Sequence, residues 1–320
     1  MKKVRLGLII TFTILLAAVC VNYIGLFAER DEVIRTSLST TENLITGNSE
    51  NEWKFYQTDD FITAEYAIVY DIETNEILYL KGSADTKIYP ASITKLFSAF
   101  VALQYLDVDT VIQAGNEIDY VKNGSSLANI EKGQKLTVES LIYGMLLPSG
   151  NDAAYVIAVA AGRTISGNLR ISSDEAVSVF VNEMNRQAKI LGMTNTNFIN
   201  PDGFHDDNHY TSLIDIVIAA KVVLNNSIIS NCVKTQNVDI VYTSGETRQW
   251  ENTNLLIDPT SEYYCEDAIG MKTGYTLEAG NCLLSAFKNK NSTYVIGTFN
   301  CDDTNSRFED AKKLYEIICK

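Results

Sequence analysis

The stretch that decides the fold reads Pro90-Ala91-Ser92-Ile93-Thr94-Lys95, with a serine three residues ahead of a lysine. Positions i and i+3 of an α-helix share one face, so a helix here brings Ser92 Oγ within hydrogen-bond reach of Lys95 Nζ. A lysine in that position can take the serine proton and turn the hydroxyl into a nucleophile. Pro90 favours a helix start, because its missing N–H needs no partner there, and Ser92 then lies at the positive end of the helix dipole. A Ser-x-x-Lys pair is expected about once by chance in a chain of this length, so its meaning depends on the rest of the sequence.

Residue periodicity on both sides of this stretch predicts a sheet built from the two ends of the chain. Short runs rich in apolar residues, separated by turn residues, predict strands over 64–71, 77–80, 268–273, 281–287 and 293–300, with a separate hairpin over 238–250. Apolar residues recur at helical spacing over 92–106, 136–145, 151–161, 173–191, 212–224 and 308–318. The sequence therefore predicts an α+β fold, an antiparallel five-stranded sheet covered by helices, with a mostly helical insertion.

The composition is that of a folded, acidic protein. Of the 320 residues, 46% are apolar, and 26 lysines and arginines stand against 40 acidic residues, for a net charge of −14. Such an apolar content supports a large core. Nucleic acid is excluded as a partner, because binding phosphates requires a basic face.

The N-terminus carries the strongest apolar run of the chain, Leu6–Ala28, preceded by Lys2, Lys3 and Arg5. The run is long enough to span a bilayer, and its basic flank should stay in the cytoplasm. We therefore expect residues 1–28 to form a membrane anchor, with a cleaved signal peptide as the alternative. Residues 29–61 are polar and predict a spacer, and residues 62–320 predict a folded domain outside the cytoplasm.

Cysteines and histidines leave two questions open. Cys282 and Cys301 lie near opposite ends of a predicted hairpin and are the best candidates for a disulfide, with buried free thiols an equal alternative. His205 and His209 are four residues apart among carboxylates, the spacing of a metal site on a helix. Their surroundings predict a loop instead, so we expect no metal.

Two further motifs give the Ser-x-x-Lys pair its meaning. Ser149-Gly150-Asn151 lies in a short predicted loop between two helices, where a hydroxyl and an amide can project into a cleft. Lys272-Thr273-Gly274 ends a predicted strand, where a cation, a hydroxyl and an unobstructed backbone can lie beside a substrate. Ser-x-x-Lys, a Ser-x-Asn element and Lys-Thr-Gly in this order are typical of penicillin-binding proteins and class A β-lactamases.

Over residues 62–320 the chain resembles the low-molecular-weight penicillin-binding proteins, the D-alanyl-D-alanine carboxypeptidase family. Beyond the three motifs, the resemblance rests on Phe180-Val181, Met184-Asn185, Leu191-Gly192-Met193, Asn200-Pro201, Gly203, Tyr275-Thr276 and Arg307-Phe308. It implies the β-lactamase and transpeptidase type of fold.

The resemblance, together with the residue types, assigns a role to each candidate. Ser92 is the nucleophile, Lys95 its base, and Ser149 relays a proton to the leaving group. Asn151 holds the acyl side of the substrate, and the N–H groups of Ser92 and Tyr275 bind the oxyanion. The substrate carboxylate is expected to bind Lys272, Thr273 and Arg307 beside the open backbone of Gly274. The mechanism implies no cofactor and no metal.

As partners, the resemblance implies peptidoglycan stem peptides as substrates and β-lactam antibiotics as inhibitors. It places the domain outside the cytoplasm at a bacterial cell membrane, tethered by the N-terminal segment, because a C-terminal anchor common in the family has no counterpart before Lys320. Two alternatives remain open: a non-catalytic penicillin-binding sensor or scaffold of the cell wall, and an endopeptidase or weak β-lactamase using the same groups.

Overall fold

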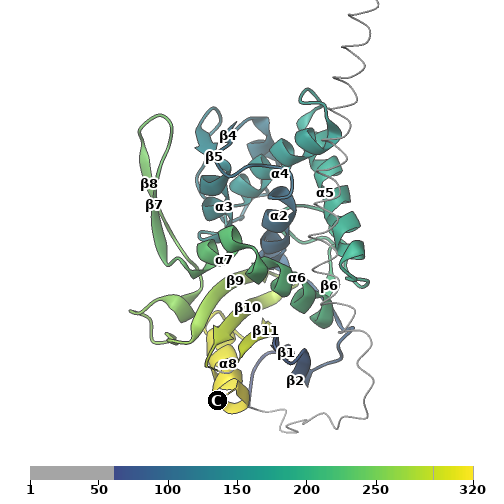
Figure 1. Ribbon diagram of the computed structural model, residues 1–320, viewed down its shortest axis with the longest axis vertical. Coiled ribbons are helices and arrows are strands. Elements are labelled where there is room, and N and C mark those ends of the chain that lie inside the picture. The colour runs from purple at the N-terminus through teal and green to yellow at the C-terminus, as the bar shows by residue number, and fades with distance from the viewer. Residues whose placement is uncertain (1–60, 291, 320) are drawn as a thin grey trace, which may run out of the picture. The chain divides into compact units, whose positions relative to one another are not determined.

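A five-stranded antiparallel sheet forms the centre of the part of the chain described by the computed structural model, residues 61–290 and 292–319 (Figure 1). The strands run in the order β2-β1-β11-β10-β9. Their bounds are β1 Tyr66–Asp71, β2 Glu76–Lys81, β9 Ala268–Thr276, β10 Gly280–Lys288 and β11 Thr293–Cys301. The predicted α+β fold, with strands from both ends of the chain in one sheet, is confirmed. The predicted anchor (1–28) and residues 29–60 of the predicted spacer lie outside the described residues.

Strand β1 joins the two ends of the chain. It pairs with β2 on one side and with β11 on the other, in a register that sets Tyr66 opposite Phe299 and Asp71 opposite Tyr294. Every residue of β1 after Tyr66 is buried. Because successive side chains point to opposite faces, a strand that is buried throughout must be covered on both sides.

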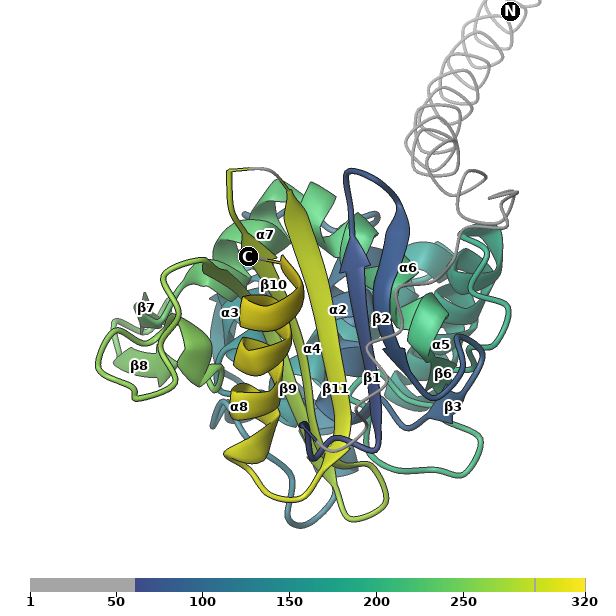
Figure 2. The ribbon, with the colours of Figure 1, turned by 90° about the horizontal axis from the view of Figure 1, so that it is seen from below.

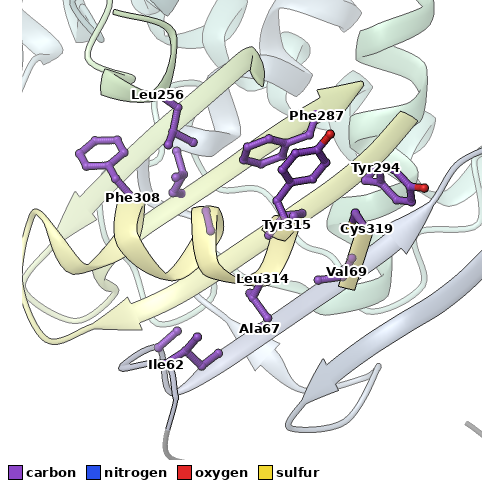
Figure 3. Close-up of a cluster of buried hydrophobic side chains, with 14 of the residues drawn as sticks. Ile62, Ala67, Val69, Leu256, Phe287, Tyr294, Phe308, Leu314, Tyr315 and Cys319 are labelled. Atoms are coloured by element: carbon purple, nitrogen blue, oxygen red, sulfur yellow. The ribbon is translucent and has the colours of Figure 1, made fainter. Parts of the chain in front are cut away.

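Helix α8 (Ser306–Leu314) covers one face of the sheet, where it runs along the strands and contacts β10 and β11 (Figure 2). Its apolar side packs on Ala67 and Val69 of β1, among other residues (Figure 3). The chain then forms a π-helical turn, Tyr315–Cys319, whose first ring stacks on Phe287 at a centroid distance of 4.5 Å. The helix predicted over 308–318 is therefore an α-helix that ends at Leu314 and a wider turn.

The remaining helices lie on the other side of the sheet (Figure 2). They are α2 Thr94–Ala102, α3 Val138–Leu146, α4 Asn151–Ser166, α5 Ser173–Ile190, α6 Leu213–Asn225 and α7 Ser227–Lys234. Every residue of α2 is buried, so this helix runs through the core. Helix α5 begins at an N-cap, where Ser172 Oγ accepts a 3.1 Å hydrogen bond from Glu175 N.

The start of the nucleophile helix differs from the prediction. Ala91–Ile93 form a 3₁₀ turn, and α2 begins only at Thr94. Ala91 has a φ of 46°, in the left-handed region that a residue with a Cβ avoids. Pro90 therefore does not lead directly into an α-helix, and Ser92 lies in the tighter turn that precedes it.

Several short elements were not predicted. Helix α7 follows α6 after a bend of 98°, where the sequence indicated only one helix. Short strand pairs join β3 (Lys87–Ile88) to β6 (Thr211–Ser212) and β4 (Val111–Gln113) to β5 (Lys135–Thr137). Further 3₁₀ turns cover Asn116–Tyr120 and Leu255–Ile257. The predicted hairpin is present as β7 (Asn237–Val241) and β8 (Thr247–Glu251), apart from the main sheet.

The cysteines of the described residues are all free and buried. The candidate disulfide is therefore not formed, and the register gives the reason: Cys301 lies opposite Asn281 in the sheet, not opposite Cys282. The register shifts between Asn281 and Leu283, so Cys282 has no directly opposed partner on β11 and the two thiols are not a facing pair.

Among residues 61–290 and 292–319, no single helix has the length and apolarity to cross a membrane, and only the bent pair of α6 and α7 passes on length and composition.

Candidate active site

Ser92 and Lys95 lie in contact at the entry to α2. Lys95 Nζ donates a 2.7 Å hydrogen bond to Ser92 Oγ and a 2.8 Å bond to the main-chain carbonyl of Asp202. Lys95 is 0% exposed, whereas Ser92 lines an open cavity. A hydroxyl that faces the cavity therefore has an amine directly behind it.

Burial tunes the amine toward the role of a base. It lowers the pKa of Lys95 from 10.5 to about 8, and the carboxylates of Asp202 and Asp152 act in the opposite direction. The pKa of Lys272 lies well below its usual range, because it is buried and faces Lys95 and Arg307.

A tight loop between α3 and α4 supplies Ser149 and Asn151. Ser149 has a φ of 65°, and a Cβ on Gly150 would lie only 2.7 Å from the nitrogen of Ala128. The main-chain nitrogen of Asn151 donates to the carbonyl of Ser126 at 2.9 Å. These contacts fix the loop, and both Ser149 and Asn151 line the same cavity as Ser92.

Strand β9 forms the wall of the cavity opposite the loop of Ser149 and Asn151. A Cβ on Gly274 would lie 3.0 Å from the carbonyl oxygen of Pro90 and 3.3 Å from the nitrogen of Ser92. Glycine at this position therefore lets β9 approach the nucleophile turn. Thr273 Oγ1 lies 2.6 Å from Thr253 Oγ1, and the side chain of Tyr275 is 60% exposed at the cavity.

Two cations lie next to this wall. Lys272 Nζ donates to the carbonyl of Thr273 at 3.1 Å, and Arg307 Nη1 donates to the carbonyl of Gly274 at 3.4 Å. Lys272 is fully buried, whereas Arg307 reaches the cavity from α8. An anion bound beside Thr273 would face both of them.

The cavity has a volume of about 470 Å³ and brings the predicted site residues together. Those that line it are Ser92, Ser149, Asn151, Thr273, Gly274, Tyr275 and Arg307. Lys95 and Lys272 lie behind its wall, each 0% exposed. No predicted site residue lies elsewhere in the fold.

Asp202 and Thr253 also line the cavity, and neither was predicted as a site residue. Asp202 Oδ2 accepts a 2.6 Å hydrogen bond from Asn151 Nδ2, and burial raises the pKa of its carboxyl. The next residue, Gly203, has a φ of 80°, and a Cβ there would overlap the carbonyl oxygen of Ala91 at 1.8 Å. Asn200-Pro201 and Gly203 were the only sequence signal for this turn.

The two histidines have different surroundings. His209 is buried: its Nδ1 accepts from the nitrogen of Ile199 at 3.1 Å, its Nε2 lies 2.9 Å from Thr94 Oγ1, and burial lowers its pKa to about 4. It is therefore a neutral structural residue. His205 lines the cavity between Asp207 and Glu278. The described residues contain no group of three or more His, Cys, Asp or Glu side chains placed to hold a metal ion.

A cavity-lining serine backed by a buried lysine is the site of a serine hydrolase whose base is an amine. The model of the family described as D-alanyl-D-alanine carboxypeptidase matches residues 54–302. The chain belongs to this family.

Individual relatives agree with this assignment. A D-alanyl-D-alanine carboxypeptidase of Bacillus subtilis is 31% identical over 259 residues, which cover 79% of this chain and 61% of the relative, so the chain spans less than two thirds of that protein's length. One of a Streptomyces species is 35% identical over 251 residues, covering 75% and 82%.

Solved structures share the fold. The crystal structure of a Streptomyces DD-transpeptidase matches with a TM-score of 0.72 at 31% identity, covering 80% of this chain and 96% of that one. A penicillin-binding protein of Listeria monocytogenes in its ampicillin-bound form matches with a TM-score of 0.66 at 25% identity, covering 82% and 100%.

Proposed function

We propose that this protein is a serine-type D-Ala-D-Ala carboxypeptidase that removes the terminal D-alanine from peptidoglycan stem peptides. The observation that carries the proposal is the 2.7 Å contact between Lys95 Nζ and Ser92 Oγ, with the lysine fully buried behind a cavity that the serine lines.

The reaction begins at Ser92. Neutral Lys95 takes the hydroxyl proton while Ser92 Oγ attacks the carbonyl carbon between the two D-alanines. The main-chain N–H groups of Ser92 and Tyr275 are the candidate donors to the oxyanion, and each such donor typically contributes about 3 kcal/mol. The close approach of Gly274 to Ser92 supports this pairing across the two walls.

The free carboxylate of the substrate sets its direction in the cavity. Lys272 and Arg307 supply positive charge beside Thr273, whose hydroxyl can donate to the carboxylate. The terminal D-alanine therefore lies at this end and the acyl chain extends past Asn151. When the tetrahedral intermediate collapses, the C–N bond breaks and Ser149 passes a proton to the leaving amine.

Water completes the cycle by attacking the ester carbonyl of the acylated Ser92. A β-lactam presents an acylating amide next to a carboxylate, so we expect it to enter the same cavity and to acylate Ser92. The similar Listeria structure is an ampicillin-bound form, which supports this expectation.

An endopeptidase or transpeptidase is the second candidate. A D-alanyl-D-alanine endopeptidase of Haemophilus influenzae is 30% identical over 265 residues, covering 81% of this chain and 83% of the relative. These reactions use the same acyl-enzyme and differ in the group that leaves or attacks. A non-catalytic penicillin-binding scaffold is the third, although Ser92, Lys95 and Ser149 are all present at the cavity.

The test is release of free D-alanine from N-acetylated peptides ending in D-Ala-D-Ala, measured beside a cross-linked dimeric muropeptide. We expect D-alanine from the linear peptide and none after Ser92→Ala. A covalent penicillin adduct without D-alanine release supports the scaffold, whereas cleavage of the dimer alone supports the endopeptidase.

We further propose that the domain works outside the cytoplasm at a bacterial cell membrane. The support is the apolar run Leu6–Ala28 with its basic flank, together with a substrate that belongs to the cell wall. Fractionation of cells that express the chain without residues 1–28 tests this: the truncated protein should leave the membrane fraction.

A further inference from the structure

We propose that Asp202 is a positioning residue that holds Lys95 and Asn151 in place through two different groups. Its main-chain carbonyl accepts the 2.8 Å hydrogen bond from Lys95 Nζ, and its carboxylate accepts the 2.6 Å bond from Asn151 Nδ2. One residue thus connects the base behind the nucleophile to the amide on the acyl side of the cavity. The inference rests on the proposed function and adds to it a residue that the three motifs do not contain.

Hydrogen bonds and close packing fasten the loop that carries Asp202 to its neighbours. Ser98 Oγ of α2 donates to the carbonyl of Pro201 at 2.7 Å, and Gly203 N donates to Asn200 Oδ1 at 2.8 Å. Gly203 packs so closely on Ala91 that no side chain fits there. Because the loop is fixed to the same turn that carries Ser92, Asp202 keeps a constant position relative to the nucleophile.

The carboxylate determines how the Asn151 amide is turned. An ionised carboxylate can only accept, so it selects the NH₂ end of the amide and turns the carbonyl end away. The second carboxylate oxygen, Oδ1, accepts from the main-chain nitrogen of Phe204 at 3.2 Å. Asp202 is 1% exposed, so solvent does not offer Asn151 an alternative partner at this position.

The charge of Asp202 also acts on the base. During acylation Lys95 changes from a neutral amine to an ammonium ion, and a negative charge nearby stabilises that product. The other charged or titratable groups around this pair are Asp152 of α4, Lys272 of β9, Arg307 of α8, Lys122 and His209. Asp202 and Asp152 favour the proton on Lys95, whereas burial opposes it.

Asp202→Asn separates charge from geometry, because the new amide oxygen can still accept from Asn151. In the pH profile of the acylation rate, the fall on the acid side, called here the acid limb, should move to lower pH by about one unit. The reason is that the ammonium form of Lys95 loses a stabilising charge. The plateau rate should fall about tenfold, because a weaker base drives the proton transfer less.

Asp202→Ala also removes the acceptor of Asn151, so its plateau rate should fall further, by about 100-fold in total. In an Asn151→Ala background most of this additional loss should disappear, while the shift of the acid limb stays.

The measurement is the rate of covalent labelling of Ser92 by a fluorescent penicillin from pH 5 to 10, on the full-length chain in detergent. Because labelling does not require D-alanine release, a failure of the proposed carboxypeptidase activity leaves this test intact. Asp215→Asn is the matched control, since Asp215 is 1% exposed, accepts from Asn195 N and does not line the cavity. It should lower the melting temperature and leave the acid limb unmoved.

An Asp202→Asn variant with an unshifted acid limb would overturn the charge role. Equal labelling rates for Asp202→Asn and Asp202→Ala would overturn the positioning of the amide. So would losses in labelling rate from Asp202→Ala and Asn151→Ala that multiply in full when the two changes are combined. If Asp202→Ala does not fold, Asp202→Asn still decides the charge role, and Asp202→Leu, which is similar in size but offers no acceptor, replaces the Ala variant in the test of the amide.

Discussion

The indole Nε1 of Trp250 donates a 3.0 Å hydrogen bond to the main-chain carbonyl of Ala128. Trp250 lies in β8, outside the main sheet, whereas Ala128 belongs to the segment whose residues Gly124, Ser125 and Ser126 line the cavity. The indole also fills the space over Gly144 of α3, where a Cβ would lie 2.9 Å from the ring. The β7–β8 hairpin therefore holds one wall of the active-site cavity from outside.

Trp250→Phe tests this support, because it removes the N–H donor and keeps an aromatic ring. The free energy of unfolding should fall by about 1–2 kcal/mol, since the buried carbonyl of Ala128 loses its donor. Penicillin labelling should slow as the wall residues shift. Gln249→Ala, at an exposed position of the same strand, is the control and should change neither quantity. Normal labelling by Trp250→Phe would show that the hairpin does not support the wall.

Gly203→Ala should be among the most damaging single-methyl additions in the described residues. The new Cβ would meet the carbonyl of Ala91 at 1.8 Å, and the φ of 80° is strained for alanine. We expect a loss of about 3 kcal/mol or more in the free energy of unfolding. The remaining folded protein should label slowly, because the turn that carries Ser92 must move.

Gly167→Ala is the matched control for that change. Gly167 has a φ of 66°, but a Cβ there meets nothing within 4 Å. It isolates the cost of the backbone conformation, about 1 kcal/mol. Equal losses for the two variants would mean that the loop moves away from Ala91 at no cost.

The parts of the molecule that depend on local patterns were predictable. Strands β1 and β11 are short apolar runs beside turns, and the two ends of the chain could therefore be assigned to one sheet. Ser92, Lys95, Ser149 and Lys272 could be identified because each lies in a short motif whose residue types point to one chemistry.

The parts that depend on distant contacts were not predictable. Asp202 acts on Lys95 across a separation of 107 residues, and nothing around it distinguishes its carboxylate from exposed ones. The 3₁₀ turn at Ser92 packs closely against Gly203 and Gly274, which lie far from it in the sequence. Of the two alternatives left open for Cys282 and Cys301, the structure has the free thiols, because proximity in a hairpin does not determine the register, and the register decides which thiols face each other.

Asp310 fixes the start of the domain to its last helix. Its Oδ2 accepts hydrogen bonds from Thr63 N, Thr63 Oγ1 and Ala64 N at 2.9, 2.9 and 2.8 Å, and the residue is 0% exposed. Asp310→Ala leaves these donors without an acceptor, so the free energy of unfolding should fall by about 3 kcal/mol in urea titrations.

Asp310→Asn keeps one acceptor oxygen and should recover part of that loss. The neighbouring Glu309→Ala, at an exposed position, is the control and should stay within about 0.5 kcal/mol of the wild type. A stable Asp310→Ala variant would show that the first strand is held by the sheet alone.

The rate of Ser92 acylation should depend on pH through Lys95. Only the neutral amine can take the serine proton, and the pKa of Lys95 is about 8. Below that pH the neutral fraction falls about tenfold per unit, so the labelling rate should fall in proportion and level off above about pH 8. Stopped-flow labelling with a fluorescent penicillin between pH 5 and 10 measures this.

Lys95→Arg should abolish labelling, because a guanidinium keeps its proton, whereas Lys189→Arg on the exposed face of α5 should leave the profile unchanged. A wild-type rate that stays flat down to pH 5 would mean that Lys95 is not the base.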